Sequence, residues 1–253
     1  MQQLTGRVRR CIEDYRMIEE GDSIAVGVSG GKDSLVLLRA LADLRRYYPK
    51  KFTLQAVTIS MGFEEMDFSP VEEFCRQLEI PYIIKQTQLA QLIFKERKEK
   101  NPCSLCSQMR RGALNDTVKE LGCTKLALGH HFDDAVETFI MSLVYEGRIA
   151  CFEPVTYMTR SEVTQIRPML YVGEGSVRKA AESLGVPVVK NPCPMDGASR
   201  REEVKQLVKS LSEQYPDLKT KIFGAMQRLP LNNWEPAPYQ RHTSTRKKDQ
   251  HLT

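Results

Sequence analysis

A glycine-rich loop with a lysine, an aspartate and two serines follows the first apolar segment of this 253-residue chain. Its sequence is Val28-Ser29-Gly30-Gly31-Lys32-Asp33-Ser34, and the residues after it have helical spacing. Paired glycines let backbone amides approach an anion, a helix N-terminus adds partial positive charge, and the lysine adds a full charge. The serine hydroxyls can also bond phosphate oxygens. The loop therefore predicts a binding site for a polyphosphate.

This loop differs from the Walker A phosphate loop. That motif needs a glycine where Val26 stands and Ser or Thr directly after the lysine, where Asp33 stands. An acidic side chain beside phosphate is repulsive unless it faces a divalent cation, so Asp33 is a candidate Mg²⁺ ligand. The alternative interpretation is a glycine turn in which Asp33 caps the following helix.

A second chemical feature is the pair Cys103 and Cys106, at the entry of a predicted helix. A helix N-terminus lowers the pKa of a thiol and favours the thiolate, the form that binds metal. Two thiolates are an incomplete set, since tetrahedral zinc takes four ligands and an iron–sulfur cluster normally takes four cysteines. Cys193, between two prolines, is the predicted third ligand, and Cys151 is its rival. A zinc staple, a redox pair and, for Cys193, an inert loop thiol are the alternatives.

Short apolar segments alternate with amphipathic ones along the chain. The expected strands are 23–28, 52–60, 81–85, 125–128, 163–167 and 186–189. The expected helices are 1–22, 34–48, 70–78, 88–97, 108–121, 133–145, 175–184, 201–211 and 217–226. This alternation predicts an α/β fold with a doubly wound parallel sheet, in which ligands bind beyond the carboxyl ends of the strands.

The composition is that of a chain that folds. Hydrophobic residues make up 41% and charged residues 27%, and the net charge of +5 permits an anionic partner without requiring one. We expect a basic N-terminal helix over 1–22, a catalytic domain over 23–200, and C-terminal helices with an extended or disordered basic tail over 201–253. No apolar stretch approaches the roughly 18 residues of a membrane span, so we expect a cytoplasmic protein with no membrane partner.

The phosphate loop resembles a known signature. Ser29–Ser34 looks like the SGGxDS motif of the PP-loop ATP pyrophosphatases, which cut ATP between the α and β phosphates and transfer AMP. The resemblance implies a PP-loop fold of the adenine nucleotide alpha hydrolase-like type, with ATP and Mg²⁺ as cofactors. It also implies that the reaction is an adenylation.

The cysteine segment carries a more specific resemblance. Pro102–Gly112, with Gly129–Asp134 downstream, is similar to the tRNA 2-thiocytidine synthetase (TtcA) family. Met17–Asp22 and Ile166–Pro168 are similar to the same family, and the likeness covers most of the chain. In that family three cysteines hold a [4Fe-4S] cluster whose fourth iron has no protein ligand.

The resemblance carries over to particular residues of this chain. Cys103 and Cys106 match the first two cluster ligands directly, and we align the third with Cys193. The residues expected to contact ATP are Val28, Ser29, Gly30, Gly31, Lys32, Asp33, Ser34, Ser60, Gly129 and Asp134, with Lys32 and Asp33 also catalytic and Asp33 on Mg²⁺. His130 and His131 are expected to shape the pocket. Ser60 lies in Thr58–Gly62, where an acidic residue is expected in better-known members.

The implied function is ATP-dependent tRNA thiolation. The C2 oxygen of a tRNA base, cytidine 32 by analogy, attacks the α-phosphate of ATP, and sulfur delivered by the cluster then replaces AMP. The implied partners are tRNA, a sulfur donor (sulfide or a cysteine desulfurase) and a second copy in a homodimer. The candidate RNA contacts are Arg7, Arg10, Arg110 and Arg111, together with the basic runs 95–100 and 246–248.

Three other functions remain open at this point. The first keeps the fold but replaces the cluster by a persulfide on Cys106 or Cys193, which the other cysteine resolves. The second is an adenylating enzyme that acts on an amino group, which the cysteine pair disfavours. The third is a nucleotide-sensing RNA-binding protein without catalytic turnover.

Overall fold

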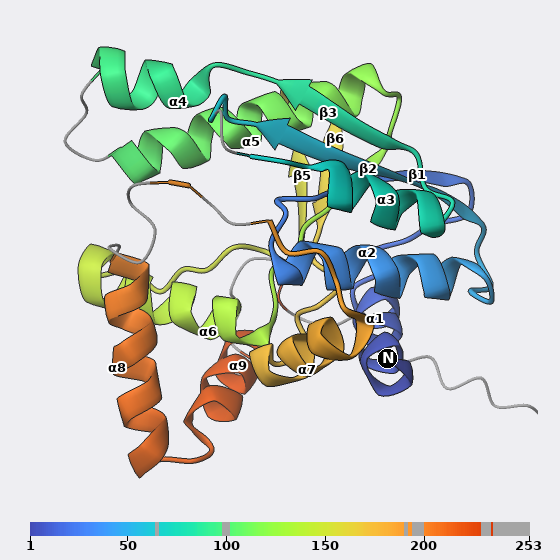
Figure 1. Ribbon diagram of the computed structural model, residues 1–253. Coiled ribbons are helices and arrows are strands. Elements are labelled where there is room, and N and C mark those ends of the chain that lie inside the picture. Colours follow the sequence, from blue (N-terminus) through green and yellow to red (C-terminus); the bar gives the residue numbers. More distant parts are fainter. Residues whose placement is uncertain (64–65, 98–101, 190–191, 194–199, 229–233, 235–253) are drawn as a thin grey trace, which may run out of the picture.

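A six-stranded sheet in the order β3-β2-β1-β4-β6-β5 forms the centre of the molecule (Figure 1). The computed structural model describes residues 1–63, 66–97, 102–189, 192–193, 200–228 and 234. The strands are β1 Asp22–Gly27, β2 Phe52–Ser60, β3 Tyr82–Gln86, β4 Lys125–Ala127, β5 Val155–Met158 and β6 Val163–Ile166. All neighbouring pairs are parallel except β5 with β6. The predicted α/β fold with a doubly wound, mostly parallel sheet is therefore confirmed.

Helices cover both faces of the sheet (Figure 1). They are α1 Gln2–Asp14, α2 Lys32–Arg45, α3 Ser69–Gln77, α4 Leu89–Gln91, α5 Pro102–Glu120, α6 Phe132–Met141, α7 Glu174–Leu184, α8 Arg200–Gln214 and α9 Leu218–Arg228, with π-helical turns η1 Leu92–Arg97 and η2 Ser142–Glu146. Strand β1 shows the two layers directly. Ile24 and Val26 face the large core under α1, α2 and α7, whereas Ala25 faces the smaller core under α5.

The strand order places a crevice at the carboxyl ends of β1 and β4. From β1 the chain proceeds to β2 and β3 on one side, and it later returns to β4 and β6 on the other. Connections that leave adjacent strands in opposite directions open a crevice between them, where ligands of such sheets bind. The loops Val28–Gly31 and Leu128–His131 both begin there.

Three local predictions are wrong. Residues 186–189 form no strand: Pro187 lacks a donor, and the segment crosses the phosphate loop, where Val189 N–H donates to Gly30 O at 2.9 Å. The edge strand β5 was not predicted because it is short and only partly buried. The helix expected over 108–121 begins at Pro102, so both cysteines of the pair lie inside it.

The N-terminal helix is also shorter than expected. It ends at Asp14 rather than near residue 22, and Arg16 adopts a left-handed φ of 49°. Its buried side chains, among them Leu4, Val8 and Ile12, join the large core. None of the described helices has the length and apolar character needed to cross a membrane.

The C-terminal tail contributes one core residue. Residues 229–233 and 235–253, including the basic run 246–248, lie outside the described residues. Trp234 is 1% exposed, its Nε1–H donates to Phe152 O at 2.9 Å, and its ring meets Phe223 edge-on at 5.4 Å. The Tyr15 hydroxyl donates to Trp234 O at 3.3 Å. The sequence analysis did not anticipate that this residue of the tail packs in the core.

Replacing this side chain should destabilise the fold. We expect Trp234→Ala to lower the free energy of unfolding by roughly 3–5 kcal/mol, because it leaves a cavity and an unpaired carbonyl. Equilibrium urea unfolding measures the change, and Tyr215→Ala, at a residue 60% exposed, is the control. A loss no larger than that of the control would contradict the docking of Trp234.

Candidate functional site

The phosphate loop is closed by its own serines. The Ser34 hydroxyl accepts from Ser29 N–H at 3.1 Å and donates to Gly31 O at 2.9 Å. Gly31 N–H in turn donates to the Ser29 hydroxyl at 3.3 Å. Gly30 has a φ of +82°, which glycine adopts without strain. The loop is thus a preformed ring of backbone groups at the N-terminus of α2.

The loop after β4 packs directly on the phosphate loop. A Cβ on Gly129 would lie 3.1 Å from Ser34 N and 3.2 Å from the carbonyl carbon of Asp33. A Cβ on Gly30 would lie 3.0 Å from Cβ of Val189. Both glycines therefore allow a second segment to approach the loop more closely than a larger residue would permit.

A cavity of about 430 Å³ opens beside these two loops. It is lined by Gly27, Val28, Ser29, Gly31, Asp33, Ser34, Val57, Ile59, Met61, Phe63, Met66, Phe68, Arg110, Leu114, Leu128, Gly129, His130, Asp134 and Val189. One side is polar and formed by the phosphate loop and the β4–α6 loop. The other is an apolar wall formed by β2 and the residues after it, which the sequence analysis did not identify.

Three residues expected at the nucleotide, Gly30, Lys32 and Ser60, are outside this lining. The Ser60 hydroxyl accepts from Gly62 N–H at 3.4 Å, and its strand neighbours Ile59 and Met61 face the cavity instead. Lys32 Nζ lies 3.5 Å from Glu174 Oε1 on α7. The ammonium group of Lys32 is therefore paired with a carboxylate that comes from far along the chain.

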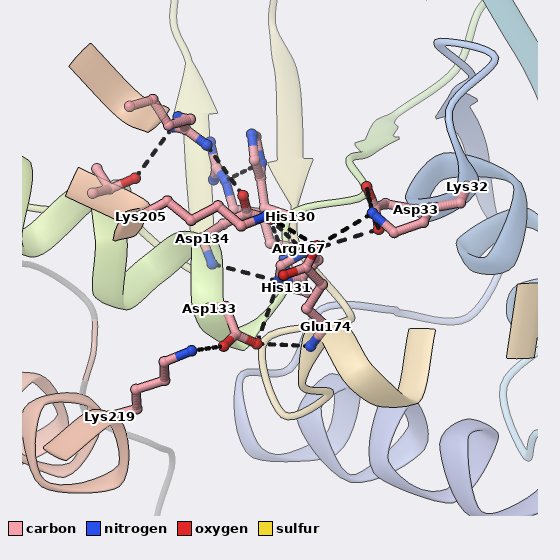
Figure 2. A network of polar contacts seen from close by, with 12 residues as sticks. Lys32, Asp33, His130, His131, Asp133, Asp134, Arg167, Glu174, Lys205 and Lys219 are labelled. Atoms are coloured by element: carbon pink, nitrogen blue, oxygen red, sulfur yellow. Dashed lines mark hydrogen bonds and ion pairs between the residues drawn. The ribbon is translucent and has the colours of Figure 1, made fainter. Parts of the chain in front are cut away.

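A network of charges surrounds the N-terminus of α6 (Figure 2). His131 and Asp134 form a reciprocal cap: His131 N–H donates to Asp134 Oδ2 at 2.9 Å, and Asp134 N–H donates to His131 Nδ1 at 3.4 Å. Asp133 accepts from Lys219 Nζ of α9 and from Glu174 N–H, both at 2.7 Å. Burial opposes ionisation of Asp133, but these donors outweigh it and lower the pKa of that carboxyl.

The helices α8 and α9 thus supply counterions to the site. Arg201 Nη1 of α8 donates to Asp134 Oδ1 at 3.1 Å, and Lys205 Nζ pairs with Glu174 at 3.1 Å. The sequence analysis missed Glu174, Arg201, Lys205 and Lys219. No local pattern marks them, because their partners lie at least 31 residues away in the chain.

Asp33 has the property expected of a cation ligand. Its Oδ1 is buried and accepts no hydrogen bond from the described residues. Lys32 Nζ is 3.3 Å and His131 Nε2 is 3.8 Å from that atom. These groups are close to Oδ1, but neither donates a hydrogen bond to it. A buried carboxylate oxygen without a partner is costly, and an oxygen-seeking cation such as Mg²⁺ would satisfy it. The residue fits the predicted Mg²⁺ site.

Helix α5 carries its two cysteines on the same face as two residues of the cavity wall. Cys103, Cys106, Arg110 and Leu114 recur at the spacing of one helix face, and the last two line the cavity. Cys106 packs with the apolar cluster around Met61. No disulfide joins the described cysteines.

Cys193 lies close to this pair. Burial raises the pKa of Cys106, the neighbouring Cys193 and Cys103 raise it further, and Arg110 partly opposes them. The expected lowering of the Cys106 pKa by the helix N-terminus is therefore wrong for the free protein. Among the described residues no three His, Cys, Asp or Glu side chains converge tightly enough to hold one metal ion. Three neighbouring thiols instead suit a larger iron–sulfur cluster, in which each cysteine binds a different iron.

Cys151, the alternative third ligand, makes a hydrogen bond and core contacts of its own. Cys151 Sγ donates to Ala135 O at 3.4 Å, and burial raises the pKa of its thiol to about 12. It packs against the large core. These contacts are those of a structural thiol.

The four candidate RNA-binding arginines fall into two places. Arg110 and Arg111 follow the cysteine pair on α5, and Arg110 lines the cavity. Arg7 and Arg10 lie on α1, no residue of which lines the cavity. Arg10 pairs with Asp14 at 3.6 Å.

The chain matches a known domain family. The PP-loop domain family covers residues 2–211, so fold, phosphate loop and cavity define a PP-loop protein. The tRNA-cytidine(32) 2-sulfurtransferase of Syntrophotalea carbinolica is 39% identical over 229 residues, 89% of this chain and 87% of that protein. That of Pelobacter propionicus is 35% identical over 225 residues, 88% and 84% of the two chains. The chain belongs to the family of the tRNA-cytidine(32) 2-sulfurtransferases, as its motifs predicted.

A solved structure is also similar. The U34-tRNA thiolase NcsA from Methanococcus maripaludis, described with its [4Fe-4S] cluster, superposes with a TM-score of 0.74 at 28% identity. The match covers 90% of this chain and 78% of the thiolase. The fold of this chain is therefore similar to that of a tRNA thiolase described with an iron–sulfur cluster.

The close approach of Gly129 gives a direct test of the nucleotide site. We expect Gly129→Ala to push the phosphate loop out of place and to raise the Kd for ATP about tenfold, or about 1.4 kcal/mol. Isothermal titration calorimetry measures the affinity. Gly6→Ala is the control, because a Cβ there meets nothing within 4 Å. Unchanged ATP affinity in Gly129→Ala would argue against nucleotide binding at this loop.

Buried Glu137 gives a prediction about pH. Burial and the nearby Asp134 carboxylate raise the pKa of Glu137 to about 7, from 4.5. The folded state therefore binds this proton more tightly than the unfolded state, so its contribution to stability is full below pH 4.5 and is lost as the pH rises to 7. The free energy of unfolding of the wild type should therefore fall by up to about 3 kcal/mol between pH 4.5 and pH 7, and Glu137→Gln should not show this decrease.

Urea unfolding at a series of pH values measures this difference. The control is Glu213→Gln, at an exposed position on α8, which should keep the wild-type pH dependence. Parallel stability curves for the wild type and Glu137→Gln would contradict the raised pKa.

Proposed function

We propose that this enzyme adenylates the C2 oxygen of a tRNA cytidine, position 32, and replaces that oxygen with sulfur. The observation that carries the proposal is the position of one cavity between the phosphate loop and the cysteine face of α5. Activation of the oxygen needs the phosphate loop, and delivery of sulfur needs the cysteines. The curated relatives act on cytidine 32 of tRNA by name, which supports the choice of base.

The phosphate loop would bind ATP and hold the leaving pyrophosphate. Its ring of amides and the N-terminus of α2 supply partial positive charge, which stabilises the negative charge that develops as the bond between the α and β phosphates breaks. Lys32 would add its ammonium group, which pairs with Glu174. Asp33 would hold Mg²⁺ through Oδ1, which accepts no hydrogen bond from the described residues.

The apolar wall would hold the flat groups of the reaction. Phe63, Met66 and Phe68 with Met61 offer apolar and aromatic surface for a purine or pyrimidine ring. Exclusion of water on this side matters, because an adenylated base is prone to hydrolysis. Ser60 is proposed to act through the position of its strand neighbours rather than by direct contact.

Cys103, Cys106 and Cys193 would hold a [4Fe-4S] cluster at three of its irons. When bound, such a cluster supplies an open iron site that can carry sulfur for transfer. The thiols must lose their protons to bind iron, and Arg110 beside Cys106 favours that loss. The apolar packing of Cys106 limits the access of water to this region.

The tRNA would approach across α5. Arg110 and Arg111 would contact its phosphates beside the cysteines, and Arg7 and Arg10 would make separate contacts from α1. We propose residues 23–200 as the catalytic unit, with the helix in 1–22 and the extension 201–253 completing it. Sulfide or a cysteine desulfurase would supply the sulfur.

The reaction can be tested directly. Protein purified and reconstituted without oxygen is incubated with unmodified tRNA, ATP, Mg²⁺ and sulfide, and the tRNA is digested for nucleoside mass spectrometry. We expect 2-thiocytidine together with pyrophosphate release that depends on tRNA. Absence of both products from protein with a full complement of iron would refute the proposal and favour a nucleotide-sensing RNA-binding protein.

The cysteines should separate sulfur delivery from activation. We expect Cys106→Ala and Cys193→Ala to lose bound iron and to reduce thiolation to about one hundredth or less, at least about 2.7 kcal/mol on the barrier. Pyrophosphate release should persist, because the phosphate loop is untouched. Cys151→Ala is the matched control and should keep both activities. Full thiolation by iron-free wild-type protein would instead favour the persulfide mechanism.

A further inference from the structure

One imidazole in the cavity wall has an unusual setting. His130 lies between Gly129 and the α6 cap, and its ring stacks on Phe152 with a centroid distance of 4.8 Å. Its neighbour in the network is Arg167, which follows β6 (Figure 2). Arg167 Nε lies 3.3 Å from His130 Nδ1. The proposed chemistry leaves both residues without a defined role.

Arg167 is immobilised by its other contacts. It is 6% exposed, its Nη1 donates to Glu153 O and to Thr156 Oγ1, and its Nη2 donates to Gln165 Oε1 at 3.4 Å. The guanidinium also lies over the Phe152 ring, 4.9 Å from its centroid. Nε is thus aimed at the imidazole by a fixed group.

This contact determines where the imidazole carries its proton. A guanidinium is a donor only, so His130 Nδ1 must accept and bears no hydrogen. The neutral ring then has its proton on Nε2, which lies across Cε1 from Nδ1 and points away from Arg167. Protonation of Nδ1 would place two donors against each other. No described side chain other than Arg167 hydrogen-bonds this imidazole.

The surrounding charges keep the ring neutral. Burial lowers the pKa of His130 to about 3, and the guanidinium groups of Arg167, Arg201 and Arg110 lower it in the same direction. Burial lowers the pKa of Arg167 to about 10, so the guanidinium stays charged at neutral pH. His130 is therefore unsuited to general acid or base catalysis near pH 7. It is suited to donate a hydrogen bond of fixed direction.

We propose that Arg167 is a positioning residue that fixes His130 as a neutral Nε2–H donor to an oxygen of the reacting centre in the cavity. The acceptor is a nucleotide phosphate oxygen or the carbonyl oxygen of the pyrimidine. The identity of these acceptors rests on the proposed function, whereas the tautomer does not. A neutral donor can stabilise a developing negative charge without transferring its proton.

Side-chain ¹⁵N NMR of histidine-labelled protein tests the tautomer. We expect His130 to carry its proton on Nε2 at pH 7 and to remain neutral at pH 5. Arg167→Met should raise the pKa of His130, because it removes a cation that lowers this pKa, while Arg148→Met, at an arginine 71% exposed, should not. An Nδ1-protonated or charged ring in the wild type overturns the proposal. Because Arg167→Met removes buried contacts, the wild-type spectrum alone already decides the tautomer.

Ligand additions identify the acceptor. A shift of the His130 Hε2 resonance on adding ATP with Mg²⁺ assigns it to a phosphate, and a shift that needs tRNA as well assigns it to the base. No shift in either case, while calorimetry shows ATP binding, overturns the proposed contact. A shift with ATP in a protein that makes no 2-thiocytidine would retain this inference and reject the proposed function.

Kinetics test the direction of the donor. The amide N–H of His130→Gln can reach the place of Nε2–H, whereas that of His130→Asn falls near Nδ1. We expect kcat/KM of His130→Gln for tRNA thiolation to exceed that of His130→Asn at least about tenfold, or about 1.4 kcal/mol, with similar folding of both. Equal activities of the two variants would overturn the assignment.

Discussion

The backbone contact between the β1–α2 loop and the β4–α6 loop is the constraint on which the site depends. Gly129 lies so close to Asp33 and Ser34 that a Cβ would be 3.1–3.2 Å from their backbone atoms. This contact is possible because β1 and β4 are neighbours whose connections leave in opposite directions. It joins the phosphate ring to the residues that line the rest of the cavity, and Val189 packs over Gly30 on the opposite side.

Charge balance extends this arrangement to the C-terminal helices. Bringing Asp33, Asp133 and Asp134 together would be unfavourable without cations, because like charges repel and buried carboxylates lose hydration. Lys219 and Arg201 form ion pairs with Asp133 and Asp134, and one oxygen of Asp33 accepts no hydrogen bond from the described residues. The pattern separates carboxylates that hold the structure together from the one that is available to a cation. It also explains why α8 and α9, late in the chain, are part of the site.

Burial shifts the pKa values of Cys106 and His130 in opposite directions and favours the neutral form of both groups. Burial raises the pKa of Cys106, so in the free protein this group favours the neutral thiol and iron binding must release a proton. Burial lowers the pKa of His130 and keeps that ring neutral as well. In the proposed function, Cys106 would release its proton when it binds iron, whereas His130 would retain its proton in one position. The same desolvation thus prepares two different chemical roles on adjacent sides of one cavity.

The amino-acid sequence by itself determined the alternation of most strands and helices, the phosphate loop, the cysteine pair and the family. These features depend on periodicity and on residues a few positions apart, which local geometry governs. Only the tertiary structure decided that 186–189 crosses the phosphate loop, that Trp234 enters the core, and that Glu174 and the cations of α8 and α9 complete the site. It also decided the sign of the Cys106 pKa shift. The physical reason is that burial and charge pairing depend on neighbours from distant parts of the chain, which no local pattern records.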